Sequence, residues 1–325
     1  LGNIECKASS STSHTYGKPL TSAEAFTAAR KTFLRHPAML KKRGDWSLTE
    51  GINHFVLHLY IQQPDDNRKP GMNAWFGTEF NRHNTWFNQA DTYFDYLRRC
   101  QHLLQQGKYV ADVCYFIGEN TPIMTGGRVP EIPDGYSYDY INAEVIMDRL
   151  SVKDGRFVLP DGMSYKVMVL PPFKTMRPEL LEKIEALVKQ GGIILGPKPE
   201  KSPSLQNFPN CDEQVKLLAD KLWSGNYENG KMTLHYGQGK VMDGYEISEV
   251  FNSINLTKDV DVPSETPVLW THRREADMDI YFITNQSDAL IELSPVFRVD
   301  SKLKPQLWDA VSGEIRALPD YEITS

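Results

Sequence analysis

The chain has 325 residues, of which 40% are hydrophobic, so it can bury a large core and form two or three domains. Its net charge is −6 and its basic residues are dispersed, which argues against a nucleic-acid-binding surface. No apolar stretch is long enough for a membrane span, so we expect no span within this chain, and no signal peptide is present in it. Because the chain opens with Leu1 rather than Met, we expect it to be a piece of a longer protein.

Two residue types bear on the class of protein. The four cysteines form no C-x-x-C pair and no zinc spacing, and Cys114 lies in an apolar run that predicts a buried thiol. Aromatic residues make up 11% of the chain, and many in the first third lie beside Asn, His or Arg. Sugar sites favour this mixture because aromatic faces cover C–H surfaces while polar groups bind hydroxyls, although filling of a core is the commoner role.

The first region, residues 1–107, combines helix and strand patterns with one long loop. Residues 27–36 have a helix-like composition that stops before a proline, and residues 51–60 alternate as a strand does. Residues 61–84 are rich in Pro, Gly and Asn, and a loop of that length in a compact domain is usually functional or disordered. Residues 85–107 predict a long amphipathic helix that ends at a glycine.

The second region, residues 108–224, alternates apolar strands with helices, which predicts a parallel sheet covered on both faces. Residues 151–162 predict an inserted hairpin that turns at Asp154 and Gly155. The predicted strands are residues 109–117, 165–172 and 192–196, and the predicted helices are residues 138–150 and 177–192.

The third region, residues 225–325, is mostly strand-like. Its alternating segments are separated by turn residues, which predicts an antiparallel β-sandwich, or the start or part of one. These segments are residues 231–242, 266–287, 290–299 and 305–318.

Residues 17–26, GKPLTSAEAF, allow two interpretations of Glu24. Thr21 and Glu24 have the spacing of a capping box at a helix start, which the local pattern alone favours. The same residues could instead form a short strand that carries Glu24 to the mouth of a pocket. Asp45 and Glu50 are also carboxylates, but they precede the strand at residues 51–60, so we expect them to serve stability.

His54 and His58 are four residues apart on that predicted strand and share one face, while Phe55 and Leu57 share the other. The spacing would suit zinc on a helix, but H-E-x-x-H is absent. Two alternatives stay open: the histidines are satisfied in a polar core, or their face points into a barrel with His58 near the active-site end.

Four early segments together resemble glycoside hydrolase family 106, the α-L-rhamnosidases. They occur in the family's order with nearly its spacing, and the similarity continues through MVLPPFKTMRPELLEKIEALVKQGGIILGPKP into the third region, covering most of the chain. The segments are ASSSTSHTYGKPLTSAEAFT, LTEGINHFVLHLY, GTEFNRHNTWF and YLRRCQHLLQQGKYVADVCYF.

The resemblance implies a fold of the α/β plus all-β class. Residues 1–107 would be the last strands and helices of a (β/α)8 barrel, with GKPLTSAEAF as strand seven and INHFVLHLY as strand eight. Residues 108–224 would be a flavodoxin- or glutamine-amidotransferase-like α/β domain, and residues 225–325 the sandwich. About six upstream barrel strands are then missing from the chain, which would be either a proteolytic or expression fragment or one piece of a longer chain.

The resemblance also implies inverting hydrolysis of terminal α-L-rhamnosyl linkages in rhamnose-containing polysaccharides, with Glu24 as the general base that ends strand seven. Leu20, Ser22 and Glu24 would alternate inward, and the next helix would start directly after the strand. The general acid would lie in the missing upstream half of the barrel, so we expect the isolated chain to be inactive. Calcium dependence and a periplasmic or secreted location are further implications. The substrate-binding candidates are His14, His54, His58, Trp75, Asn81, Arg82, Asn84 and Trp86.

The base must be ionised when it acts, and His14, His58 and Arg82 are candidate donors to it. No Ca²⁺ loop of recognisable spacing is present, so no metal ligand is predicted. Two rival functions remain: another glycosidase of the same clan, such as a β-galactosidase-like enzyme, and a non-catalytic carbohydrate-binding or assembly module.

Overall fold

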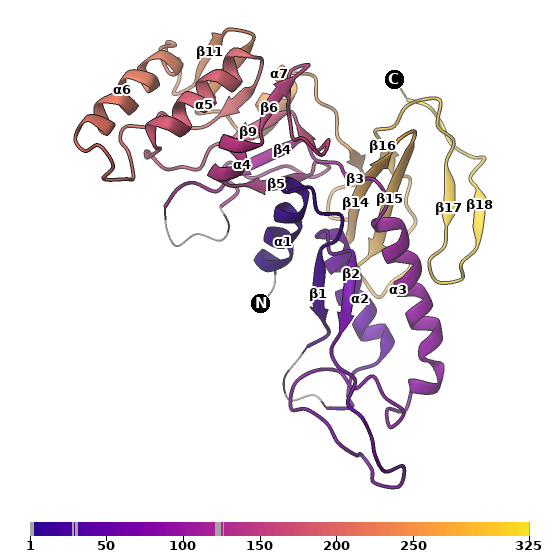
Figure 1. Ribbon diagram of the computed structural model, residues 1–325. Coiled ribbons are helices and arrows are strands. Elements are labelled where there is room, and N and C mark those ends of the chain that lie inside the picture. Colours follow the sequence, from indigo (N-terminus) through magenta and orange to yellow (C-terminus); the bar gives the residue numbers. More distant parts are fainter. Residues whose placement is uncertain (1–2, 28, 30–31, 121–124, 126, 325) are drawn as a thin grey trace. The chain divides into compact units, whose positions relative to one another are not determined.

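A computed structural model describes residues 3–27, 29, 32–120, 125 and 127–324 (Figure 1). The chain forms two compact units, each built from separate stretches of sequence. Unit 1 comprises Leu1–Lys18, Lys108–Thr266 and Glu292–Arg298; unit 2 comprises Pro19–Gly107, Pro267–Ile291 and Val299–Ser325. Within the described ranges, no helix has both the length and the apolar character that crossing a membrane requires.

Unit 1 is centred on a six-stranded sheet in the order β11-β12-β10-β9-β4-β5, in which only β11 is antiparallel to its neighbour. Taken in chain order, the five parallel strands have the spatial order 2-1-3-4-5 of flavodoxin-like folds. The strands are β4 (Val113–Phe116), β5 (Tyr138–Ile141), β9 (Val167–Val169), β10 (Ile193–Leu195), β11 (Met232–Tyr236) and β12 (Gly239–Asp243).

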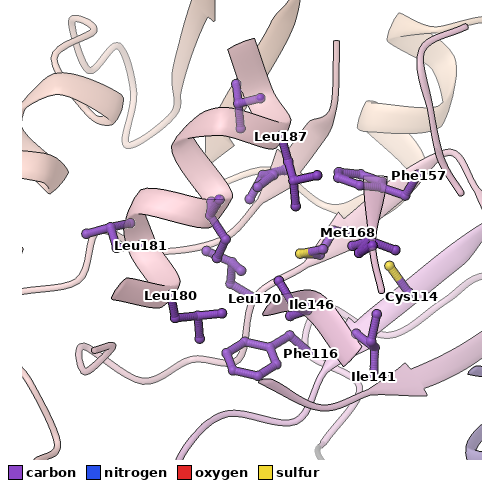
Figure 2. Packing of buried hydrophobic residues seen from close by; sticks show 14 of the residues in the cluster. Cys114, Phe116, Ile141, Ile146, Phe157, Met168, Leu170, Leu180, Leu181 and Leu187 are labelled. Atoms are coloured by element: carbon purple, nitrogen blue, oxygen red, sulfur yellow. The ribbon is translucent and has the colours of Figure 1, made fainter. Parts of the chain in front are cut away.

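Helices cover both faces of this sheet. Successive residues of each strand point to opposite sides, so each face packs its own set of side chains against its helices. One face, which carries Cys114, Phe116 and Met168, packs against Ile146 of α4 and the leucines of α5 (Figure 2). Helix α6 packs into the same cluster. The other face packs against α7. The helices are α4 (Ala143–Asp148), α5 (Pro178–Lys189), α6 (Asn210–Leu222) and α7 (Ile247–Ser253).

The remaining elements of unit 1 are short, apart from one polar helix that contacts the edge strand β5. The predicted hairpin is confirmed: β6 and β7 pair antiparallel, and Asp154 and Gly155 at the turn both have positive φ. These elements are α1 (Asn3–Thr15), β3 (Lys108–Tyr109), β6 (Ser151–Lys153), β7 (Arg156–Val158), β8 (Ser164–Tyr165), β13 (Val260–Asp261) and β16 (Val296–Phe297).

The packing of α5 against the sheet can be tested by mutation of its buried leucines. Leu180 of α5 is fully buried, whereas Leu205 is 83% exposed. We expect Leu180→Ala to lower the free energy of unfolding by about 2–5 kcal/mol, since it removes buried methyl groups and leaves a cavity. Leu205→Ala is the matched control and should change it by less than about 0.5 kcal/mol. Urea denaturation followed by circular dichroism measures both; equal effects would show that α5 does not pack as described.

Unit 2 holds the parallel strand pair β1–β2, helices α2 and α3, and two antiparallel hairpins. Its core contains Leu48, Phe80 and Leu97, with Phe55 and Leu57 packed against it. The elements are β1 (Ser22–Ala25), α2 (Pro37–Thr49), β2 (His54–Leu57), the 3-10 turn η1 (Phe87–Gln89), α3 (Ala90–Leu104), β14 (Val268–Glu275), β15 (Met278–Asn285), β17 (Gln306–Trp308) and β18 (Ile315–Ala317).

Asp45 of α2 is buried and has three side-chain partners in unit 2. It lies 2.6 Å from Lys41 Nζ, accepts from Tyr96 at 2.6 Å and accepts from Thr284 at 2.8 Å. Burial, together with Cys100 and Asp45, raises the pKa of Tyr96, so its phenol stays a donor. These contacts agree with the stability role expected for Asp45.

Two local predictions were wrong. The described part of residues 27–36 is not helical; the helix starts at Pro37, because proline is favoured at the first helical position and forces His36 into an extended conformation. Residues 138–150 are not one helix but strand β5 followed by α4, which begins after Asn142 caps Val145 N.

The predicted domain boundaries also differ from the observed units. The hairpin at residues 231–242 adds to the parallel sheet of unit 1 instead of opening a sandwich, because β12 pairs with β10. Helix α1 belongs to unit 1 rather than to the first region, and β14 and β15 belong to unit 2. The strands β14, β15, β17 and β18 themselves occur as predicted.

Candidate active site

The strand pair β1–β2 of unit 2 determines which way the Glu24 side chain points. β1 and β2 run parallel, with Ser22 opposite His54 and Glu24 opposite Val56. Side chains alternate along each strand, so these four share one face, which is largely exposed, while Ala25 and its neighbours on the other face pack inward. Glu24 therefore lies on a strand, and the capping-box interpretation is wrong.

The carboxylate of Glu24 is accessible and has two neighbours on the same side. Its side chain is 65% exposed. Oε1 accepts a hydrogen bond from Thr27 Oγ1 at 2.9 Å, and His58 Nδ1 lies 3.9 Å from the same oxygen. A helix was predicted to start directly after β1, but the described residues between β1 and Pro37 are not helical, and Phe26 has a φ of 72°. Leu20 and Ser22 are exposed like Glu24.

The two histidines of the β2 segment face the same side as Glu24. His54 lies 2.8 Å from Ser22 Oγ through Nδ1. The His58 ring stacks on Phe76, with ring centroids 5.2 Å apart and an interplanar angle of 13°. The predicted alternation is confirmed, since Phe55 and Leu57 contact the core of unit 2.

Arg35 ties the turn after Glu24 to the long loop. Its guanidinium is buried and donates to the carbonyls of Phe26, at 2.8 Å, and of Gly77. Burial lowers the pKa of Arg35, and the charge of Glu79 opposes that shift. The turn and the loop beside His58 are thus held together.

The loop candidates divide into exposed and buried side chains. Trp75 is 72% exposed and meets Phe76 edge to face at 4.8 Å, so its ring is free to contact a ligand. Arg82 is partly exposed and pairs with Asp66 at 2.7 Å. Trp86 is partly buried and donates to Arg35 O at 2.8 Å.

Asn81 and Asn84 are buried and shape the turn after Phe80. Asn84 donates to Glu79 O at 2.9 Å, and Asn81 Oδ1 accepts from His83 N at 3.0 Å. The structure brings Glu24, His54 and His58 onto one strand face, whereas these asparagines make contacts that organise the loop itself.

His14 lies in unit 1, where it belongs to a polar cluster around Asp139. Its Nδ1 is 2.9 Å from Asp139 of β5, and its ring stacks on Tyr109 at 4.5 Å. Ser11 and Tyr165 also donate to Asp139, at 3.0 and 2.9 Å. The ring of His14 is buried and its Nδ1 helps to attach α1 to the sheet, while its donation to Glu24 stays a prediction.

The carboxylate at the centre of this cluster stays charged although it is fully buried. Burial works against ionisation of Asp139, but the charge and hydrogen bond of His14, the charge of Lys7 and the hydrogen bond of Tyr165 outweigh it and hold its pKa below the usual range. Burial and Asp139 together raise the pKa of Tyr165, which keeps its phenol protonated as a donor.

Three residues beside the Glu24 face were not predicted from the sequence: Thr27, Arg35 and Phe76. Phe76 carried a signal, because it follows Trp75 in a loop already selected for its aromatic residues. Thr27 follows Glu24 by three positions, which is meaningful only once the backbone is known to turn there.

The sheet of unit 1 has a second edge at which a ligand site could lie. Flavodoxin-like sheets bind ligands beyond the carboxyl ends of the strands at the switch point, here between β4 and β9. In the described residues Glu119 accepts from the Arg177 backbone N at 2.8 Å and pairs with its Nε, and a Cβ at Gly118 would lie 3.1 Å from the Phe173 ring. The chain's own side chains thus occupy this edge.

A metal centre has no counterpart in the described part of the chain, where no group of three or more His, Cys, Asp and Glu side chains could hold an ion. These residues alone do not fit the calcium site that the resemblance implies.

Comparison with known proteins places the chain among the glycoside hydrolases. The family model that matches, over residues 2–323, is described as alpha-L-rhamnosidase. The chain therefore belongs to glycoside hydrolase family 106, the family of its sequence resemblance.

Three individual proteins are similar to this chain over part of their own length. The rhamnosidase structure from Novosphingobium sp. PP1Y has a TM-score of 0.88 and 31% identity over 97% of this chain and 30% of its own. A Formosa agariphila protein named "Putative beta-glucuronidase" is 40% identical over 311 residues, 94% of this chain and 25% of its own length. A GH42 beta-galactosidase from G. stearothermophilus has a TM-score of 0.53 at 11% identity, covering 87% of this chain and 49% of its own, which shows a similar fold only. The chain thus spans between a quarter and a third of the first two proteins.

Proposed function

We propose that this chain is part of an α-L-rhamnosidase that removes terminal α-L-rhamnosyl groups from polysaccharides with inversion, and that Glu24 is its general base. The observation that carries the proposal is the accessible carboxylate of Glu24 on a parallel strand pair, with Thr27 and His58 beside one of its oxygens. Family membership supports the substrate class.

The chemistry requires two carboxyl groups on opposite sides of the glycosidic bond. One protonates the leaving oxygen as the C1–O bond breaks; the other takes a proton from water as the water oxygen bonds to C1 on the opposite face. The two groups stand roughly 6.5–9.5 Å apart, which leaves room for the water. An exposed carboxylate such as Glu24 suits the base, since it must be ionised and reachable by water.

Sugar contacts are proposed for the side chains that share the strand face or project from the loop. His54 and His58 offer ring nitrogens to hydroxyls, and the exposed Trp75 ring offers an apolar face to C–H groups. Arg82 extends the polar surface, while Asn81, Asn84 and Trp86 hold the loop that carries these groups.

The general acid is proposed to come from a part of the protein that precedes this chain. Two parallel strands cannot close a barrel, and β1 and β2 each leave one edge without a partner strand in the described residues. We propose that they are strands seven and eight of a (β/α)8 barrel whose other strands complete the pocket. The short coverage of the longer relatives supports this.

The substrate assay tests the proposed function directly. The full-length protein should release phenol from an aryl α-L-rhamnoside with inverted product configuration, detected by NMR, and the isolated 325-residue chain should not. Full turnover by the isolated chain would disprove the divided site. Adding EDTA to the same assay tests the proposed calcium requirement. A periplasmic or secreted location is also part of the proposal.

The name of the Formosa agariphila relative favours one second candidate, a β-glucuronidase. A glucuronide carries a carboxylate that needs a cation, and Arg82, the cationic candidate of the loop, already pairs with Asp66. Aryl β-glucuronide and β-galactoside in the same assay separate these activities; preferential turnover of either would replace rhamnoside as the substrate. Saturable binding of rhamnose-containing oligosaccharides with no turnover of any substrate would instead indicate a binding module.

A further inference from the structure

The two side chains beside Glu24 converge on the same carboxylate oxygen. Thr27 Oγ1 donates to Oε1 at 2.9 Å, and His58 Nδ1 lies 3.9 Å from Oε1. Thr27 follows the end of β1 and His58 follows the end of β2, so the two approach from separate segments. Both contacts involve Oε1, and neither involves Oε2.

The position of the His58 ring is fixed from several sides. Its backbone N donates to Ala25 O at 2.8 Å, and its carbonyl accepts from Thr78 N at 2.9 Å. The ring stacks on Phe76, and a Cβ at Gly77 would lie only 3.0 Å from Nδ1, so the loop backbone lies close against the ring. The direction of Nδ1 therefore follows from packing.

His58 Nδ1 is a buried polar atom with no hydrogen-bond partner among the described residues. Buried polar atoms in folded proteins are nearly always paired. The carboxylate of Glu24 is the charged group beside it, and a shift of about 1 Å would bring Oε1 within hydrogen-bond distance. Catalytic hydrogen bonds are often long in unliganded enzymes and shorten when substrate binds.

We propose that Thr27 and His58 are positioning residues for Glu24, which together hold Oε1 and leave Oε2 as the oxygen that takes the proton from water. This inference rests on the proposed function. A carboxylate held through one oxygen keeps the other at a defined point, and proton transfer depends strongly on that geometry. Phe76 contributes by keeping the His58 ring plane fixed.

The test uses paired variants of the full-length protein assayed on the aryl glycoside that it hydrolyses. Thr27→Val removes the hydroxyl with little change in shape, and His58→Phe keeps the stacked ring but removes the donor. Each should lower kcat about 10–100-fold, the effect of losing a hydrogen bond to a charged group. KM should stay within about twofold in Thr27→Val, whereas His58→Phe also removes the ring nitrogen proposed to bind a sugar hydroxyl and should raise KM. Thr27→Ser and His58→Asn restore a donor and should recover most of kcat.

Thr266→Val is the matched control, because its partly exposed hydroxyl donates to a neighbouring carbonyl, that of Pro263, at 2.6 Å. It should leave both constants unchanged. Wild-type kcat in Thr27→Val and His58→Phe, or an equal loss in Thr27→Ser and His58→Asn, overturns the positioning role. If Glu24→Gln still loses activity in that case, the proposed function stands without it. If the wild-type protein hydrolyses no glycoside, both proposals are wrong.

Discussion

Glu24→Gln in the full-length protein should lower kcat for an aryl α-L-rhamnoside by about 10²–10⁴-fold, the usual contribution of a general base. The substitution keeps the shape of the side chain and an oxygen that accepts from Thr27, but it cannot take a proton from water. Substrate binding should survive, so KM should change little compared with kcat. Steady-state kinetics on the purified variant measure both constants.

The control for this variant is Glu182→Gln on the exposed face of α5, which removes the same charge in unit 1. It should hydrolyse the substrate at the wild-type rate. If Glu24→Gln also retained full kcat, another carboxylate would have to be the base, and the assignment of the β1–β2 face as the active site would be wrong.

Asp139→Asn should reduce the free energy of unfolding of the protein by about 3–5 kcal/mol, because it removes one charge from a buried, paired cluster. Asp139 is fully buried; it accepts from Ser11 and Tyr165 and lies 2.9 Å from His14 Nδ1. Without the carboxylate these groups face an amide that cannot satisfy all of them, and Lys7, 3.8 Å away, loses its counter-charge. Urea denaturation followed by circular dichroism measures the loss.

The sign of the pH dependence follows from the direction of the pKa shift. The folded protein holds the pKa of Asp139 below its usual range, so folding favours the ionised form. The resulting stabilisation is complete above the unfolded pKa, about 3.9, and is lost as the pH falls through the folded value. The stability difference between wild type and Asp139→Asn should therefore shrink below about pH 4.

Asp148→Asn serves as the control for this prediction, since Asp148 is exposed on α4 of the same unit. Its effect should be within about 0.5 kcal/mol. A difference for Asp139→Asn that stayed constant down to pH 2, or that matched the control at neutral pH, would mean that the buried carboxylate does not carry this stabilisation.

The parallel sheet could be predicted from sequence because its strands are short apolar runs between amphipathic helices. Strand β5 was missed for a physical reason: its YDYI sequence carries a buried carboxylate, and its charge partner His14 is 125 residues away in sequence. Local periodicity cannot reveal a contact between such distant residues. The hairpin β11–β12 was recognised as strands, but its membership of the sheet depends on pairing with β10.

The candidate site could be predicted to the extent that alternation predicts side-chain direction. The placement of His54 and His58 on one face of β2 followed from alternation alone. The presentation of Glu24 on a strand came from the family resemblance, since the local pattern favoured a helix cap. The contacts of Thr27 and Phe76 depend on backbone turns that no periodicity specifies.

The interleaving of the two units limits how this protein can be divided. The chain passes from one unit to the other after Lys18, Gly107, Thr266, Ile291 and Arg298. No single cut can release either unit intact, and a recombination event that exchanged residues 1–107 as one block would separate α1 from the strand that holds it. We therefore expect the segments that build the two units to be inherited together, and truncations to be tolerated only outside them.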